Sequence, residues 1–232
     1  MSEGPHDLFD REGWWDPACR AFASLRAVTT FRLQLLQRWL PGDWRGRVVV
    51  DLGCGGGLLA VPLARAGATV LGVDLARRAL REGRACGAPG FLPLAGDLLR
   101  SPIGAGRADV VLLADVVEHV PEPALAVREA ARLLRQGGRL FVNTIDRTAR
   151  SRLLAITLAE GLGYVPRGTH DWRRFVRPQE LDAMANAAGL RRLARAGEAP
   201  RLWRTLRSRT VTLRESRWIT AGYAALYERV GA

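Results

Sequence analysis

Short apolar runs alternate with amphipathic segments through the middle of the chain. Runs of four to eight residues rich in Val and Leu predict buried strands, and longer segments with apolar residues every three or four positions predict helices. Five strands are predicted at residues 48–51, 69–74, 90–94, 109–114 and 138–144. Helices are predicted at 56–66, after the second strand to about 86, and at 123–134. This alternation predicts a parallel sheet with helices on both faces.

The pattern changes on either side of this core. An N-terminal helix is predicted at 24–40, ended by Pro41 and Gly42. Residues 146–178 are too long for a plain connection between a strand and a helix, so they are predicted to be an insertion. The end of the chain is predicted to supply a helix and the last two strands, at 179–188, 190–196 and about 218–229.

The most informative motif is a glycine-rich loop that follows the first strand. It begins with Asp51 and continues with Gly53, Gly55 and Gly57. Glycine lets the backbone turn sharply and approach a ligand, and the helix after the loop presents free N–H groups. A dinucleotide fingerprint would need glycine at Leu58, and a P-loop would need lysine, which this chain lacks. The loop therefore suits a ligand without a pyrophosphate.

Acids after the next two strands extend this candidate site. Asp74 ends the second strand, where a carboxylate can accept hydrogen bonds from a ribose. Asp97 follows the third strand, where it suits the amino group of an adenine. Together with the glycine loop, these acids resemble the S-adenosylmethionine (SAM) site of class I SAM-dependent methyltransferases.

A third group of candidates follows the fourth strand. Asp115 and Glu118 are three positions apart and share a face on one helical turn, with His119 beside them. Two carboxylates and an imidazole can bind Mg²⁺, which would make a catechol hydroxyl more acidic. Two other interpretations stay open: His119 acts alone as a general base, or Glu118 and His119 only shape the cofactor pocket.

Charge and composition bear on partners and location. The net charge is +12, and every basic residue other than histidine is arginine. Residues 147–217 contain 16 Arg and 6 acids, which favours an anionic lipid or nucleic-acid surface unless the arginines are merely solvated. The absence of an 18-residue apolar run, the polar start and three dispersed cysteines predict a cytoplasmic protein. The arginine surplus adds the expectation that the protein is peripheral on the inner face of the membrane.

Taken together, these motifs resemble those of the O-methyltransferases of ubiquinone biosynthesis, which act on polyprenyl catechol or hydroxyphenol rings. The resemblance spans roughly residues 9–190. It is carried by Trp14-Trp-Asp16, Phe31-Arg-Leu33, Val50-Asp-Leu-Gly-Cys-Gly-Gly-Gly57, Val117-Glu-His-Val-Pro121 and Gly168-Thr-His-Asp-Trp172. Two positions depart from the family pattern: Ala114 stands where a bulky residue is usual, and Asp115 stands where Glu is common.

The resemblance implies a Rossmann-like α/β fold with a mostly parallel seven-stranded sheet whose last strand is antiparallel. It implies that Arg32, Gly53, Asp74 and Ala114 bind SAM, and that Asp115, Glu118 and His119 bind a divalent ion. We expect a single domain with four segments. These are an N-terminal helical cover (1–45), a SAM-binding core (46–145), an insertion or lid with membrane contact (146–178) and a segment that completes the sheet (179–232).

The predicted reaction is methyl transfer to a phenolic hydroxyl of a lipophilic quinone precursor. One alternative is a secondary-metabolite O- or N-methyltransferase on the same fold, and another is a non-catalytic SAM-binding protein. An RNA methyltransferase is suggested by charge alone, and the sequence shows neither an Asn-Pro-Pro-Tyr motif nor a nucleic-acid-binding appendage. The pattern therefore disfavours nucleic acid as the partner.

Overall fold

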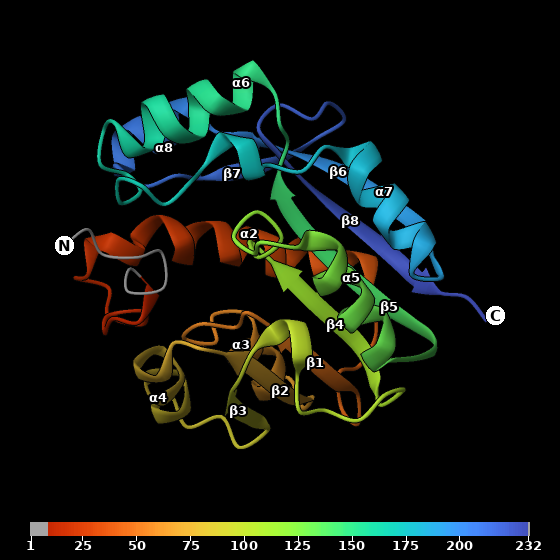
Figure 1. Cartoon of the computed structure of the whole chain (residues 1–232). Coiled ribbons are helices and arrows are strands. Elements are labelled where there is room, and N and C mark those ends of the chain that lie inside the picture. Colours follow the sequence, from red (N-terminus) through yellow and green to blue (C-terminus); the bar gives the residue numbers. More distant parts are fainter. Residues whose placement is uncertain (1–8, 232) are drawn as a thin grey trace.

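The computed structural model describes residues 9–231 as one mixed sheet with helices on both faces (Figure 1). The strands are β1 (Val48–Leu52), β2 (Thr69–Asp74), β3 (Phe91–Ala95), β4 (Ala108–Ala114), β5 (Leu134–Ile145), β6 (Leu190–Pro200), β7 (Leu213–Ser216) and β8 (Gly222–Arg229). Their order in the sheet is β3-β2-β1-β4-β5-β8-β6-β7. The first five strands pair in parallel, and β8 pairs antiparallel with both β5 and β6.

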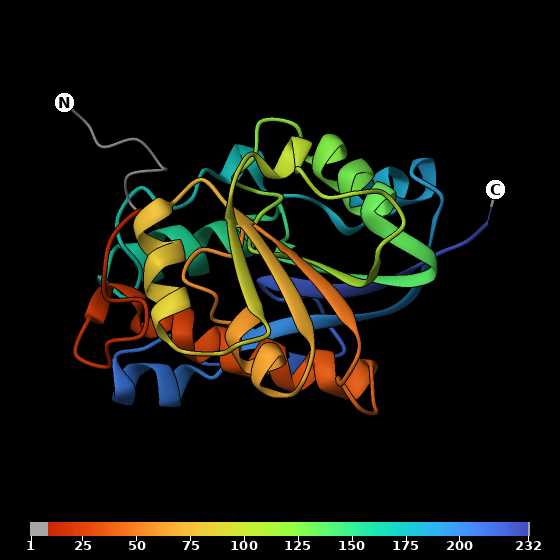
Figure 2. The same ribbon diagram turned by 90° about the horizontal axis from the view of Figure 1, so that it is seen from below.

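The helices divide between the two faces of the sheet. They are α2 (Ala23–Trp39), α3 (Ala60–Arg65), α4 (Arg77–Ala85), α5 (Pro123–Leu133), α6 (Ala149–Ser151), the π-helix η3 (Arg152–Glu160), α7 (Pro178–Ala187) and α8 (Leu202–Ser208). Short 3₁₀ helices are η1 (Arg20–Phe22), η2 (Leu98–Arg100) and η4 (Trp172–Arg174). Figure 2 shows α2 and α5 on opposite sides of the sheet.

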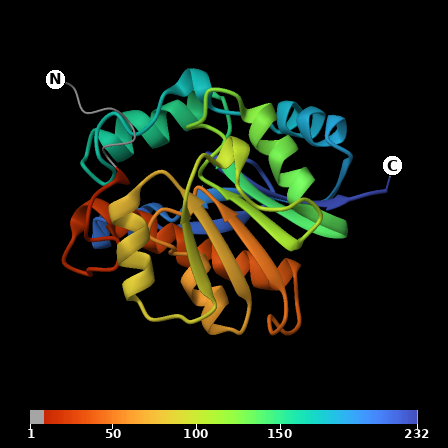
Figure 3. The same cartoon turned by 60° about the horizontal axis from the view of Figure 1, so that its bottom comes forward.

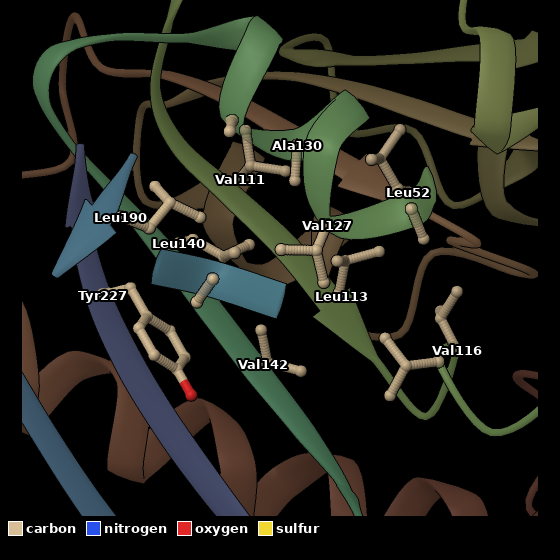
Figure 4. Close-up of a cluster of buried hydrophobic side chains, with 14 of the residues drawn as sticks. Leu52, Val111, Leu113, Val116, Val127, Ala130, Leu140, Val142, Leu190 and Tyr227 are labelled. Atoms are coloured by element: carbon tan, nitrogen blue, oxygen red, sulfur yellow. The ribbon is translucent and has the colours of Figure 1, made fainter. Parts of the chain in front are cut away.

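Successive side chains of a strand point to opposite faces of the sheet, so helices cover both faces. In β1, Val50 packs with the apolar side of α5, whereas its neighbour Val49 packs with α2 and α3. The cluster on the α5 side includes Val127, Leu140 and Tyr227, which Figure 4 shows converging between helix and sheet. Strands that are buried on both faces read as continuous apolar runs, which is why the sequence locates them.

The predicted fold class is confirmed, with one difference in the sheet. The sheet has eight strands rather than seven, because β7 pairs antiparallel with the outer edge of β6. The helix after the glycine loop begins at Ala60 rather than at residue 56, since residues 55–59 form turns. Helix α8 was not predicted, and β8 begins at Gly222, later than the expected residue 218.

The insertion leaves the end of β5 and returns to α7. It contains α6, η3 and η4, and Figure 3 shows it lying across one end of the molecule. None of the described helices combines the length and apolar character needed to cross a membrane.

Candidate active site

The glycine loop connects β1 to α3 and is tied to the end of β2. Gly53 N–H donates to the Val73 carbonyl at 2.7 Å, and Gly55 N–H donates to Asp74 Oδ2 at 2.7 Å. Gly53, Gly55 and Gly57 all have positive φ, the region that other residues rarely adopt. A Cβ at Gly53 would also lie only 2.6 Å from a methyl group of Val116. The loop conformation therefore depends on glycine.

Asp51 and Asp74 bring two carboxylates to this loop. Asp51 is 3% exposed in β1, and burial, followed by the charge of Asp74, raises its pKa to about 7. Asp74 is half-buried, and its second oxygen accepts from Ala76 N–H at 2.8 Å. A cationic ligand would favour the ionised form of both acids.

Two further predicted cofactor residues, Asp97 and Ala114, lie at the same edge of the sheet. Asp97 is exposed after β3, where its side chain accepts from Leu99 N–H at 2.8 Å and caps η2. Ala114 is the last residue of β4 and is half-buried. Because β3, β2, β1 and β4 are parallel neighbours, their carboxyl ends present these residues along one edge.

Arg32 lies on α2 and is buried in a cluster of ion pairs. Its guanidinium donates to both carboxylate oxygens of Glu198, at 3.2 and 2.9 Å, and also to Asp115 Oδ2. Burial lowers the pKa of Arg32, but the two carboxylates together raise it above its usual range. The guanidinium therefore remains charged, and only its unused N–H donors can reach a bound ligand.

Asp115, Glu118 and His119 point to different partners, so the predicted metal set is not assembled. Asp115 pairs with Arg32 and accepts from Asn143 Nδ2 at 3.0 Å, whereas Glu118 accepts from Thr144 Oγ1 at 2.8 Å. His119 packs against other rings. Among residues 9–231, no three His, Cys, Asp or Glu side chains are grouped to hold a metal ion. The arrangement of these residues therefore does not fit the expected Mg²⁺.

Glu118 and Asn143 are buried polar groups that each keep one oxygen without a partner among the described residues. Glu118 is 2% exposed, and burial, followed by the charge of Asp115, raises its pKa to about 8. Glu118 Oε1 and Asn143 Oδ1 have no hydrogen-bond partner within the described chain. A protonated Glu118 can donate a hydrogen bond, which an ionised carboxylate cannot.

His119 is enclosed by aromatic rings at the end of the turn after β4. Its ring centroid lies 5.8 Å from that of Phe9 and 5.9 Å from that of His170 in the insertion. Burial, followed by the proximity of His170, lowers the pKa of His119 to about 4. His119 is therefore neutral at physiological pH, and it is a weak proton acceptor there.

The N-terminal segment covers the glycine loop. Trp14 is buried against Gly55 and Gly56, and Trp15 Nε1 donates to the Gly56 carbonyl at 2.7 Å. Glu82 on α4 holds this segment by accepting from the backbone N–H groups of residues 13–15. The cover packs on the loop at Gly55 and Gly56, and a cavity of about 460 Å³ lies elsewhere, beside Asp146.

Sequence reasoning missed four polar residues of this region. Glu82, Asn143, Glu160 and Glu198 lie on α4, β5, η3 and β6. Among these four, only Glu198 could have been found from the sequence, because a carboxylate in an otherwise apolar run such as Gly197-Glu-Ala199 needs a partner.

Comparison with known proteins identifies the family. Residues 50–142 match the family model described as a methyltransferase domain. A ubiquinone biosynthesis O-methyltransferase from Ralstonia nicotianae is 44% identical over 185 residues, which cover 76% of this chain and 75% of the relative. One from Thiobacillus denitrificans is 41% identical over 76% of this chain and 77% of the relative.

Solved structures show the same fold. A SAM-dependent methyltransferase from Thermotoga maritima gives a TM-score of 0.72 at 22% identity, over 97% of this chain and all of the other. Magnesium protoporphyrin IX methyltransferase from Synechocystis with bound SAM gives 0.66 at 18% identity, over 99% of each chain. The fold, the methyltransferase domain and the extent of the sequence identity agree: the chain is a SAM-dependent methyltransferase that belongs to the ubiquinone biosynthesis O-methyltransferase family.

Proposed function

We propose that this protein transfers a methyl group from SAM to a phenolic hydroxyl of a lipophilic quinone precursor in ubiquinone biosynthesis. The observation that carries the proposal is the 44% identity, over three quarters of both chains, to a relative named for this pathway. The geometry supports it, because the glycine loop, Asp74 and the turn after β4 lie along one edge of the sheet.

The residues at this edge suit each part of SAM. Asp74 would accept hydrogen bonds from the ribose hydroxyls, and Asp97 would accept one from the adenine amino group. The backbone of the glycine loop, with the unused donors of Arg32, would hold the amino acid end. When bound, SAM supplies an electrophilic methyl group on a sulfonium.

The acceptor would lie beyond the methyl group, next to the turn after β4. The rings of Phe9, His119, His170 and Phe175 follow one another there with centroids 5.8 to 5.9 Å apart. Such a row of rings can pack against a phenol and exclude water from its hydroxyl. Proximity and orientation would then provide most of the rate enhancement.

Methyl transfer from labelled SAM to a panel of acceptors tests the proposal. We expect transfer to polyprenyl catechols, and we expect turnover to persist in EDTA because the predicted metal ligands point to different partners. Transfer only to soluble catechols or amines would instead favour a secondary-metabolite methyltransferase. Tight SAM binding without transfer to any acceptor would indicate a non-catalytic SAM-binding protein.

We also propose that the protein is cytoplasmic and makes a peripheral contact with anionic membrane. Exposed apolar side chains gather on η3 and the turn after it, and also on α8: Leu153, Leu158, Leu162, Leu202, Trp203 and Leu206. The segments that follow η3 and α8 both bond to Ser24, whose hydroxyl donates to the Tyr164 carbonyl at 2.6 Å and accepts from Val211 N–H at 3.0 Å. Arginines beside these apolar residues would pair with anionic headgroups.

Flotation with liposomes tests this membrane contact. We expect binding to anionic vesicles, little binding to zwitterionic ones, and loss of binding as salt increases. The double variants Leu153→Ser/Leu162→Ser and Leu202→Ser/Leu206→Ser should each weaken it. Leu92→Ser is the matched control, because Leu92 is similarly exposed, at 45%, on β3. Equal flotation of all these variants would contradict the contact.

A further inference from the structure

The insertion contains one histidine, His170, which faces His119 and is held by a buried acid. Glu160, the last residue of η3, is 5% exposed, and its Oε1 lies 2.9 Å from His170 Nδ1. The same oxygen accepts from His170 N–H at 2.9 Å, and Oε2 accepts from Gly168 N–H at 2.8 Å. Glu160 therefore holds both the backbone and the ring of His170.

These contacts decide which nitrogen of His170 carries the proton. Burial raises the pKa of Glu160, but the hydrogen bonds from His170 and Gly168 outweigh it, so that the pKa is lowered overall. An ionised carboxylate can only accept, so Nδ1 of His170 must donate to it. In the neutral imidazole, Nε2 then carries the free lone pair, as in other histidines that an acid orients through Nδ1.

The ring of His170 stands where an acceptor would approach. It lies 5.9 Å from the ring of His119, and it meets Phe175, which is 1% exposed, edge to face at 5.9 Å. Arg174, which donates weakly to the His119 carbonyl at 3.4 Å, lies on the same segment. The insertion thus brings an oriented imidazole to the carboxyl end of β4.

We propose that His170, oriented by Glu160, is the general base that takes the proton of the acceptor hydroxyl. This inference rests on the proposed function and assigns a group to its proton-transfer step. The phenolic proton passes to His170 Nε2 while the oxygen bonds to the methyl carbon. The bond between carbon and sulfur breaks, the sulfonium becomes the neutral thioether of S-adenosylhomocysteine, and the imidazolium is stabilised by Glu160.

His119 is less suited to this step. Its ring packs against the rings of Phe9 and His170, whereas the ring of His170 is held by a carboxylate at Nδ1. Among the described residues, the charges of Asp115 and Arg174 act on His119, and Glu160 accepts a hydrogen bond from the ring of His170. A cavity of about 380 Å³ borders Glu160 between Arg20 and Tyr164. His119 then serves as part of the aromatic wall.

The test compares His170→Gln and Glu160→Gln with His119→Gln, and uses Asp171→Asn as the control beside His170. Asp171 is exposed and only caps η4. We expect His170→Gln to lower kcat by about 10²–10⁴-fold, the usual contribution of a general base. Glu160→Gln should lower kcat by about tenfold or more and weaken the pH dependence, whereas His119→Gln should lose less than about tenfold. The KM for SAM should stay within about twofold in every variant, since proton transfer does not affect its binding.

A nitro-substituted catechol distinguishes a role of His170 as general base from a purely structural role. Its hydroxyl is ionised at neutral pH and needs no base, so it should restore most of the lost rate to His170→Gln. Failure of this rescue, or a larger loss in His119→Gln than in His170→Gln, would overturn the assignment. If wild-type protein methylates no phenol at all, the proposed function fails. If wild type is active and His170→Gln equals it, only the role of His170 fails.

Discussion

Replacing Arg32 with Met tests whether the buried ion-pair cluster holds α2 against the sheet. Arg32 and Glu198 side chains are 7% and 2% exposed, and Asp115 is 24% exposed. Methionine keeps the length of the side chain and removes the charge. Two carboxylates would then remain in the interior without their cation.

The expected cost follows from that burial. Removing one partner of a buried ion pair destabilises a protein by about 3–5 kcal/mol, because the remaining charge stays desolvated. For a domain of this size that corresponds to a fall in Tm of roughly 6–20 °C. Arg38→Met is the matched control, since Arg38 also lies on α2 and pairs with a glutamate of the C-terminal strands. Its pair with Glu215 is 57% and 44% exposed, so the loss should be below about 1 kcal/mol.

Urea unfolding at several pH values gives the decisive readout. Burial raises the pKa of Glu198, while Arg32 opposes this rise, so Arg32→Met should raise that pKa further. A carboxyl group with a raised pKa in the folded state stabilises the protein as the pH falls. The deficit of Arg32→Met should therefore shrink between pH 8 and pH 5, and that of Arg38→Met should not. Equal, pH-independent losses of unfolding free energy in the two variants would show that the buried ion-pair cluster does not hold α2 against the sheet.

Three further variants probe other parts of the site. The free energy of unfolding of Glu118→Gln should rise by about 1–3 kcal/mol relative to that of wild type between pH 5 and pH 9. The reason is that wild type loses stability as the pH rises from about 4.5 to the raised pKa of Glu118, about 8, whereas glutamine does not titrate. A pH-independent difference between the two proteins in urea unfolding would contradict this prediction. Asp74→Asn should weaken SAM binding about 10–100-fold by calorimetry through the loss of a charged hydrogen-bond acceptor, and an unchanged Kd would exclude the ribose contact. Trp14→Ala should cost about 3–5 kcal/mol, because the indole is 6% exposed and stacks on Phe22 at 4.6 Å; a loss below about 1 kcal/mol in urea unfolding would show that the N-terminal cover unfolds independently.

The sequence predicts the central sheet well because each central strand is buried on both faces. Val48–Leu52 and Ala108–Ala114 are apolar apart from Asp51 and Asp109, and helix α2 shows apolar residues at helical spacing. The edge strand β7 escaped prediction, since its four residues, Leu-Arg-Glu-Ser, join the sheet mainly through the backbone of β6. A polar edge strand has no hydrophobic pattern to reveal it.

The side-chain partners at the site were less predictable for a different reason. Arg32 and Glu198 are 166 positions apart, and only the order of the sheet brings β6 near α2. Asp115, Glu118 and His119 are close in sequence and share a turn, which suggested a metal site. In the structure each of them contacts a partner from another element instead. The spacing of residues within one turn cannot predict such contacts with distant parts of the chain.

The charge balance at the carboxyl edge supports a cationic ligand independently of any resemblance. Asp51, Asp74, Asp115 and Glu198 lie along the strands from β2 to β6, and Arg32 is the cation that pairs with two of them. Burial, followed by the charge of Asp74, raises the pKa of Asp51, so a cation bound beside Asp51 would favour its ionised form. A sulfonium and an ammonium group would offset the negative charge of these acids, whereas a pyrophosphate would add to it. The same acids therefore favour SAM over a dinucleotide at a loop whose glycines alone would be ambiguous.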